Sequence, residues 1–194
     1  MNSPNRYFKI FFVAVMSATL LSGAAIGTTL VRMDLIALAH SAEVIVRARC
    51  INSEARWESG SIWTFDDLAV VEIFKGSPLQ RLRIRLAGGR VGHLETKVDG
   101  VPHFVPGEEL VLFVEHNSAS DYSITGWEQG TFRVHRDTTG EAQLTQDSSH
   151  LAVFDARTRQ FATAGIRNIS LSEFRERLSA ALGAPVPERL EGQR

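Results

Sequence analysis

Apolar and polar residues alternate one by one in several segments between residues 43 and 135. The clearest segment is Arg81–Leu86, in which leucine or isoleucine occupies every second position and arginine the positions between. Because successive side chains of a β-strand point to opposite faces of a sheet, this pattern predicts a strand with one buried and one solvated face. Glycine-containing turns separate the alternating segments, so we expect a mainly β fold.

Two long segments precede this one. Glu43–Ile51 places Cys50, the only cysteine of the chain, on its buried face, where it acts as a small hydrophobic residue. Ile62–Lys75 loses its alternation near Val71, which predicts a β-bulge. Long bulged strands curl around barrels, so the pattern favours a small closed or partly open barrel over a sandwich. Further strands are predicted at Leu110–Val114, Tyr122–Trp127 and Gly130–His135, with a final hairpin of Ala142–Leu144 and Leu151–Phe154.

Two short segments have the residue spacing of amphipathic helices. Asp34 is placed to cap a short helix that runs to Ala42, and Ser170 with Glu173 forms a capping box for a second helix. The predicted organisation is an N-terminal segment over residues 1–27, a barrel domain over 33–155, a C-terminal helix over 170–183 and a flexible tail over 184–194.

The N-terminus has the features of a targeting segment. Arg6 and Lys9 precede an apolar run that ends in small residues between Ser22 and Gly27. This order predicts a signal peptide and an exported protein, periplasmic or secreted. The uncharged stretch from Lys9 to Arg32 is also long enough to span a membrane, so a retained anchor is the alternative, and membrane contact would then involve only this segment.

The composition of the chain limits the partners and the kinds of chemistry that we expect. The formal net charge is −1, so the chain has no overall basic field and we expect no nucleic-acid partner. A single cysteine cannot form an internal disulfide, and the sequence leaves any redox role of Cys50 open. No cofactor motif is present, and no residues are predicted to be catalytic.

Four segments resemble the netrin-like module, the OB-type barrel of the tissue inhibitors of metalloproteinases. They are Ala42–Ala48, Leu68–Gly76 with its Phe-Lys-Gly end, Gly107–Phe113, and Tyr122–Gly126. The resemblance implies an OB-like β-barrel. The inhibitors grip the protease zinc through an N-terminal cysteine, which has no counterpart here, so their mechanism does not carry over.

The chain is also similar to a group of uncharacterised exported bacterial proteins, a likeness that implies no known activity. It rests on short glycine- and proline-containing motifs, namely Lys75-Gly76, Gly88-Gly89-x-x-Gly92, Pro102-x-Phe104 and Gly107-Glu108.

Arg81, Arg83 and Arg85 share one strand face, and Arg90 follows just beyond. OB-type barrels often bind oligonucleotides or oligosaccharides on an exposed sheet face, and stacking aromatic residues such as Trp63 accompany such charges in single-strand binders. We interpret these five residues as candidates for a ligand surface, for an unknown protein or saccharide outside the cytoplasm. The competing interpretation is a solvated strand face with flanking acidic residues.

Other candidate sites are weaker. His93, Glu95 and His103 lie on one loop and could form a metal site, or serve a hydrolase that uses residues 88–104. Asp66 and Asp67 are neighbours, as are Glu108 and Glu109; adjacent strand residues point oppositely, so we expect solvated positions rather than a catalytic pair. The leading hypothesis is a non-enzymatic binding or interaction module, and the alternatives are a protease-regulating netrin-like domain and this hydrolase.

Overall fold

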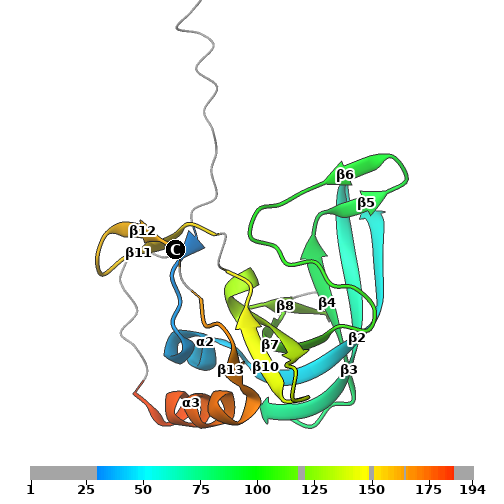
Figure 1. Cartoon of the computed structure of the whole chain (residues 1–194). Coiled ribbons are helices and arrows are strands. Elements are labelled where there is room, and N and C mark those ends of the chain that lie inside the picture. Colours follow the sequence, from blue (N-terminus) through cyan, green and yellow to red (C-terminus); the bar gives the residue numbers. More distant parts are fainter. Residues whose placement is uncertain (1–29, 118–120, 149–150, 164, 186–194) are drawn as a thin grey trace, which may run out of the picture.

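The computed structural model describes residues 30–117, 121–148, 151–163 and 165–185. The predicted leader, residues 1–27, and most of the predicted tail lie outside these ranges. The protein is mainly β, as predicted, and two short helices, α2 and α3, lie together at one edge of the molecule (Figure 1).

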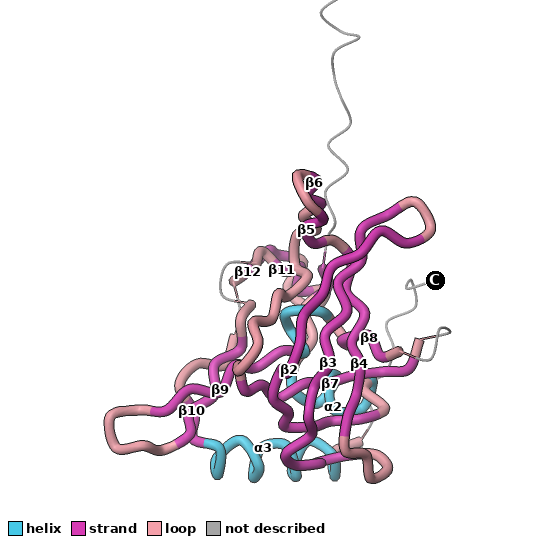
Figure 2. The backbone as a smooth tube through the Cα atoms, turned by 90° about the vertical axis from the view of Figure 1, so that its right-hand side faces the viewer, coloured by secondary structure: helices cyan, strands magenta, loops and turns pink. Residues whose placement is uncertain are grey.

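A long hairpin forms the centre of the fold. β2 (Val44–Glu58) and β3 (Ser61–Lys75) pair along almost their whole length, and Ser59 and Gly60 turn the chain with φ of 51° and 81°. The register shifts where Val71 is left unpaired, which confirms the predicted bulge. Both strands are longer than the alternation suggested, and their far end extends beyond the rest of the sheet beside β5 (Gly89–Val91) and β6 (Leu94–Thr96) (Figure 2).

The hairpin belongs to an eight-stranded sheet with the order β13-β10-β9-β7-β2-β3-β4-β8. β8 also pairs with β7, antiparallel, and meets β4 in parallel through Ile84 and Tyr122. The bounds of the strands not yet given are β4 (Arg81–Ala87), β7 (Glu109–His116), β8 (Tyr122–Ile124), β9 (Thr131–Arg136), β10 (Ala142–Gln146) and β13 (Ile169–Ser170). Trp127, predicted to end a strand, instead starts a short 3-10 helix, η1 (Trp127–Gly130).

A second, three-stranded sheet lies beside the first. β1 (Leu30–Val31) pairs in parallel with β11 (Val153–Asp155), which pairs with β12 (Gln160–Ala162). The predicted final hairpin is therefore wrong, because β10 pairs with β9 and β13 while β11 lies in the other sheet. A short alternating segment identifies a strand, but it does not identify the partner.

The two helices are capped as predicted. In α2 (Leu35–Ser41) the Asp34 carboxylate accepts the Ala37 N–H at 2.8 Å, and in α3 (Leu171–Gly183) the Ser170 hydroxyl accepts the Glu173 N–H at 3.1 Å. Lys75 completes the other end of α2, where its Nζ donates to the carbonyl groups of Ala39 and Ala42. Through these hydrogen bonds, Lys75 of the Phe-Lys-Gly segment holds the end of β3 against the C-terminal end of α2. Neither helix of the described part of the chain has the length and apolarity needed to cross a membrane.

Two apolar cores lie on opposite sides of β2 and β7. One core gathers the inward residues of β2, β3, β4, β7 and β8, including Cys50, which is buried as predicted. The other lies under α2 and α3, where Phe113 and Phe132 of the sheet contact Phe174 of α3 with ring centroids 6.5 and 5.3 Å apart. Burial on both faces explains why β7 has a continuous apolar sequence rather than an alternating one.

Candidate functional site

The predicted ligand surface lies on the outer face of β3 and β4. Arg81 and Arg83 are exposed, Arg85 is half-buried, and the apolar residues between them point inward. Trp63 and Phe65 of β3 pair in register with Ala87 and Arg85 of β4, so the structure brings Trp63 to the arginines. Arg90 lies on β5, in a different sheet from the other three arginines.

Two arginines of this face are stacked on aromatic rings. The Arg85 guanidinium carbon lies 4.1 Å from the Trp63 ring centroid and 5.8 Å from that of Phe65, and the Arg56 guanidinium carbon lies 3.8 Å from the Phe65 centroid. Stacking fixes the guanidinium planes and adds a cation–π attraction. Phe65 is 5% exposed because the two arginines cover it. No sequence motif marks Arg56 and Phe65, since their proximity depends on the β2–β3 register.

Acidic residues share this face, as the interpretation of a solvated strand face with flanking acids expects. Asp67 accepts a hydrogen bond from Arg83 at 2.7 Å, and this contact lowers the pKa of Asp67. Glu58 lies 3.7 Å from both Arg56 and Arg85. Arg81 is exposed, and no ion pair of it is found within the described residues. The face therefore combines fixed cations with some positive charge left for a ligand.

The loop candidates for a metal or hydrolase site are solvent-exposed. His93 lies in the turn between β5 and β6, Glu95 lies on β6, and His103 lies in the loop before β7. Across the described ranges, no three or more histidine, cysteine or acidic residues are arranged to hold a metal ion. The structure thus does not bring these three residues together as a ligand set.

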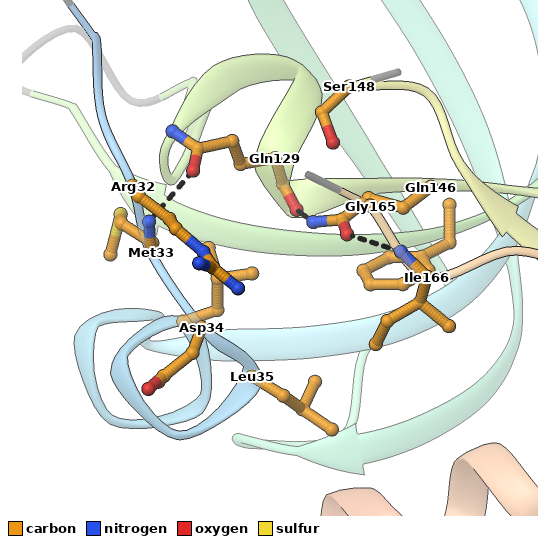
Figure 3. A pocket seen from close by; sticks show the side chains of 11 residues that line it. Arg32, Met33, Asp34, Leu35, Gln129, Gln146, Ser148, Gly165 and Ile166 are labelled. Carbon is orange, nitrogen blue, oxygen red and sulfur yellow. Dashed lines mark hydrogen bonds between the residues drawn. The ribbon is translucent and has the colours of Figure 1, made fainter. Parts of the chain in front are cut away.

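A pocket that the sequence did not indicate lies between α2, η1, β9 and β10. Its volume is about 200 Å³, and Figure 3 shows the side chains that line it. Two buried glutamines fix one wall. Gln129 Oε1 accepts the Met33 N–H at 2.8 Å, and Gln146 Oε1 accepts the Ile166 N–H at 3.1 Å. Gln146 Nε2 also donates to the Gln129 carbonyl, so the wall is a connected network.

Apolar side chains complete the lining, and the lining residues come from four separate parts of the chain. These residues follow no sequence motif, which is why the sequence did not reveal the pocket. The apolar members are Met33, Leu35, Leu38, Phe132 and Ile166.

No protein-family model and no curated protein matches this chain.

Asp66 is an ionisable group inside the strand layer, and its expected solvated position was wrong. Its side chain points inward between Thr64 and Leu68, the residue is fully buried, and neither carboxylate oxygen accepts a well-formed hydrogen bond from the described residues. Burial raises the pKa of Asp66 to about 6, an effect that Ser53 partly offsets and that the charges of Asp67 and Glu108 increase. Burial, with Asp66 as the next cause, raises the pKa of Cys50 to about 11, so this thiol is protonated at neutral pH.

Proposed function

We propose that this protein is an exported, non-enzymatic binding module with an OB-like barrel, and that its ligand face is the outer surface of β2, β3 and β4. The strand pairings support the barrel, because β2, β3, β4, β8 and β7 are each paired to the next and β7 pairs again with β2. Barrels of this type commonly bind ligands on a sheet face. Fold alone does not establish function, so the proposal needs support from the residues of the outer surface of β2, β3 and β4.

The single observation that carries the proposal is the stacking of Arg56 and Arg85 on Phe65 and Trp63. A free arginine side chain loses rotamer entropy when it binds, whereas a stacked one is already held in place. Arg81 and Arg83 extend the face along β4 and alternate with buried residues, so their spacing is set by the strand. This arrangement suits an extended ligand with repeated anionic groups.

We propose an acidic polysaccharide as the ligand class. Uronic-acid polymers present repeated carboxylates, each of which can pair with an arginine. Nucleic acid is disfavoured by the near-neutral net charge of the chain and by the export that we propose.

The experiment compares two double variants that remove the same charge. Arg81→Gln/Arg83→Gln changes the proposed face, whereas Arg136→Gln/Arg159→Gln changes exposed arginines of β9 and the β11–β12 turn. Binding to polygalacturonate is measured by surface plasmon resonance, with neutral dextran as the reference polymer. We expect the first pair to weaken binding about tenfold or more, since a charge-assisted hydrogen bond contributes about 1.5–3 kcal/mol. Equal effects of the two pairs, or no preference over dextran, would contradict the proposal.

A protease regulator and a hydrolase have less support. Within the described residues, β1 is half-buried and paired with β11, so Leu30 and Val31 do not form a free wedge of the kind that netrin-like inhibitors insert into proteases. The hydrolase would need His93, Glu95 and His103 to converge, and each of them is exposed.

A further inference from the structure

The pocket between α2, η1, β9 and β10 has the properties of a small-ligand site. We infer that it binds a small carboxylic acid with a short, branched aliphatic body, and that Arg32 holds the carboxylate. This site is separate from the outer face of β2, β3 and β4 and does not depend on the function proposed for that face.

Arg32 provides the charged group, and it is held from one side only. Its Nη1 donates to Asp155 Oδ2 at 3.0 Å, and Asp155 is itself fixed by the backbone N–H groups of Arg157 and Thr158. No partner for Nε or Nη2 of Arg32 is found among the described residues. The Nε–Nη2 edge of a guanidinium is a fork of two parallel donors that matches a carboxylate. Figure 3 shows the Arg32 side chain extending across the pocket.

The buried glutamines make the polar wall rich in donors. Both carboxamide oxygens already accept backbone N–H groups, and each Nε2 donates once, to Val31 O from Gln129 and to Gln129 O from Gln146. Each Nε2 therefore has one N–H left, while each Oε1 already accepts one backbone N–H. The remaining N–H groups can donate to a ligand that accepts hydrogen bonds.

Asp34 is an acidic residue that lines the pocket, but its charge does not oppose the binding of a carboxylate. Asp34 Oδ1 accepts the Ala37 N–H at the start of α2, and Figure 3 shows its carboxylate directed away from Gln146 and Ile166. The negative charge of Asp34 thus interacts with the free N–H groups at the N-terminus of α2.

The apolar wall and the volume define the rest of the ligand. Leu35, Leu38, Phe132 and Ile166 offer only hydrocarbon, so an aliphatic body is favoured over a sugar. A cavity of about 200 Å³ is below the usual range of about 300–1,000 Å³ for drug-sized ligands. A branched acid of about eight non-hydrogen atoms fits both limits.

The test is an NMR titration of the full chain with 4-methylpentanoate and with its neutral amide, 4-methylpentanamide. We expect saturable shifts for the acid at the backbone N–H groups of Met33 and Ile166 and at the side-chain amides of Gln129 and Gln146. An affinity of about 1 mM is reasonable for so small a ligand. The amide should bind at least about tenfold more weakly. Equal binding of the two, shifts confined to β4, or no saturable shift would overturn the inference.

Three variants separate recognition from support of the fold. Arg32→Gln should weaken acid binding at least about tenfold, and Arg32→Lys, which keeps the charge and loses the fork, should give a smaller loss. Asp155→Asn cuts the ion pair but leaves Arg32 charged, so acid binding should be kept or strengthened. If Arg32→Gln and Asp155→Asn lose binding equally while thermal melts show both folded, Arg32 has only a structural role and the inference fails.

Discussion

Asp66 and Asp67 are consecutive carboxyl groups on one strand, and their environments are opposite. Asp66 lies on the inner side of β3, fully buried and without a well-formed hydrogen bond from the described residues. Asp67 lies on the outer side, with Arg83 at 2.7 Å. The pKa of Asp66 is raised to about 6, mainly by burial, and that of Asp67 is lowered, mainly by Arg83.

The comparison shows that the face of the strand, rather than the residue type, sets the chemistry of this sheet. On the inner side, burial removes water from the Asp66 carboxylate and Ser53 only partly compensates, so the neutral form is favoured. On the outer side, Arg83 donates a hydrogen bond to Asp67 and stabilises its carboxylate. The inner side therefore stabilises the fold through apolar contacts, and the outer side is the face for which we propose ligand binding.

The largest expected effect comes from truncating an inner residue of β4. Ile84→Ala should lower the free energy of unfolding by about 2–5 kcal/mol, because Ile84 is fully buried and the cavity cannot collapse completely. The matched outer variant Arg83→Ala should lower it by less than about 1 kcal/mol, since it removes one exposed ion pair. Urea denaturation of both variants measures the difference. Similar losses would show that β4 does not separate two environments.

The next effect concerns the charge of Asp66. Its folded-state pKa is raised, so it favours folding below pH 4 and opposes folding increasingly as the pH rises to about 6. Asp66→Asn should therefore raise the free energy of unfolding at pH 7.5 by up to about 3 kcal/mol, at about 1.36 kcal/mol per pKa unit. Urea denaturation between pH 4 and 8 should show a flatter stability profile for the variant. Destabilisation at pH 7.5 would mean that the ionised carboxylate is well solvated or paired.

A glycine on the inner side of the hairpin tests close packing there. Gly89 has φ of +126°, and a Cβ on it would lie 2.3 Å from Thr64 Oγ1 and 2.9 Å from Ala55 Cβ. Gly89→Ala should lower stability by about 1–3 kcal/mol more than Gly92→Ala, which also has positive φ but has nothing within 4 Å of the added carbon. Thermal melts of the two variants give the comparison, and equal melting temperatures would remove the packing argument.

The smallest expected effect lies on the outer side. Asp67→Asn should lower the free energy of unfolding at neutral pH by no more than about 1 kcal/mol, because the ion pair with Arg83 is partly exposed and screened. The sign is opposite to that of Asp66→Asn, since the lowered pKa of Asp67 stabilises the fold at neutral pH and this stabilisation is lost on acidification. Repeating the measurement in 1 M NaCl should reduce the loss further.

Local signals in the sequence predicted much of the fold. The Asp34 and Ser170 caps, the alternation of β4 and the bulge at Val71 each depend on residues close together in the chain, and the structure has all four. The pairing of β11 with β1 and the stacking of Arg56 on Phe65 depend on which segments meet in space, which residue spacing does not specify.

The candidate sites divide in the same way. Alternation placed Arg81, Arg83 and Arg85 on one face, but their acidic partners and stacked rings come from neighbouring strands. The alternation of β3 contains a signal for the burial of Asp66, because Ile62, Thr64 and Leu68 occupy the same face of the strand. The acidic residue type favours solvent, so the two signals conflict at this position. The pocket at Arg32 had no signal, since its walls are assembled from distant parts of the chain.

The separation of the two sides of β3 is tested most directly by titrating the side-chain carboxyl carbons of Asp66 and Asp67 by NMR in the folded protein. The structure predicts a pKa of about 6 for Asp66 and a pKa below the usual 3.8 for Asp67. Titration of both groups near 3.8, or a higher pKa for Asp67 than for Asp66, would contradict the assignment of one carboxylate to the interior and the other to the arginine-bearing face.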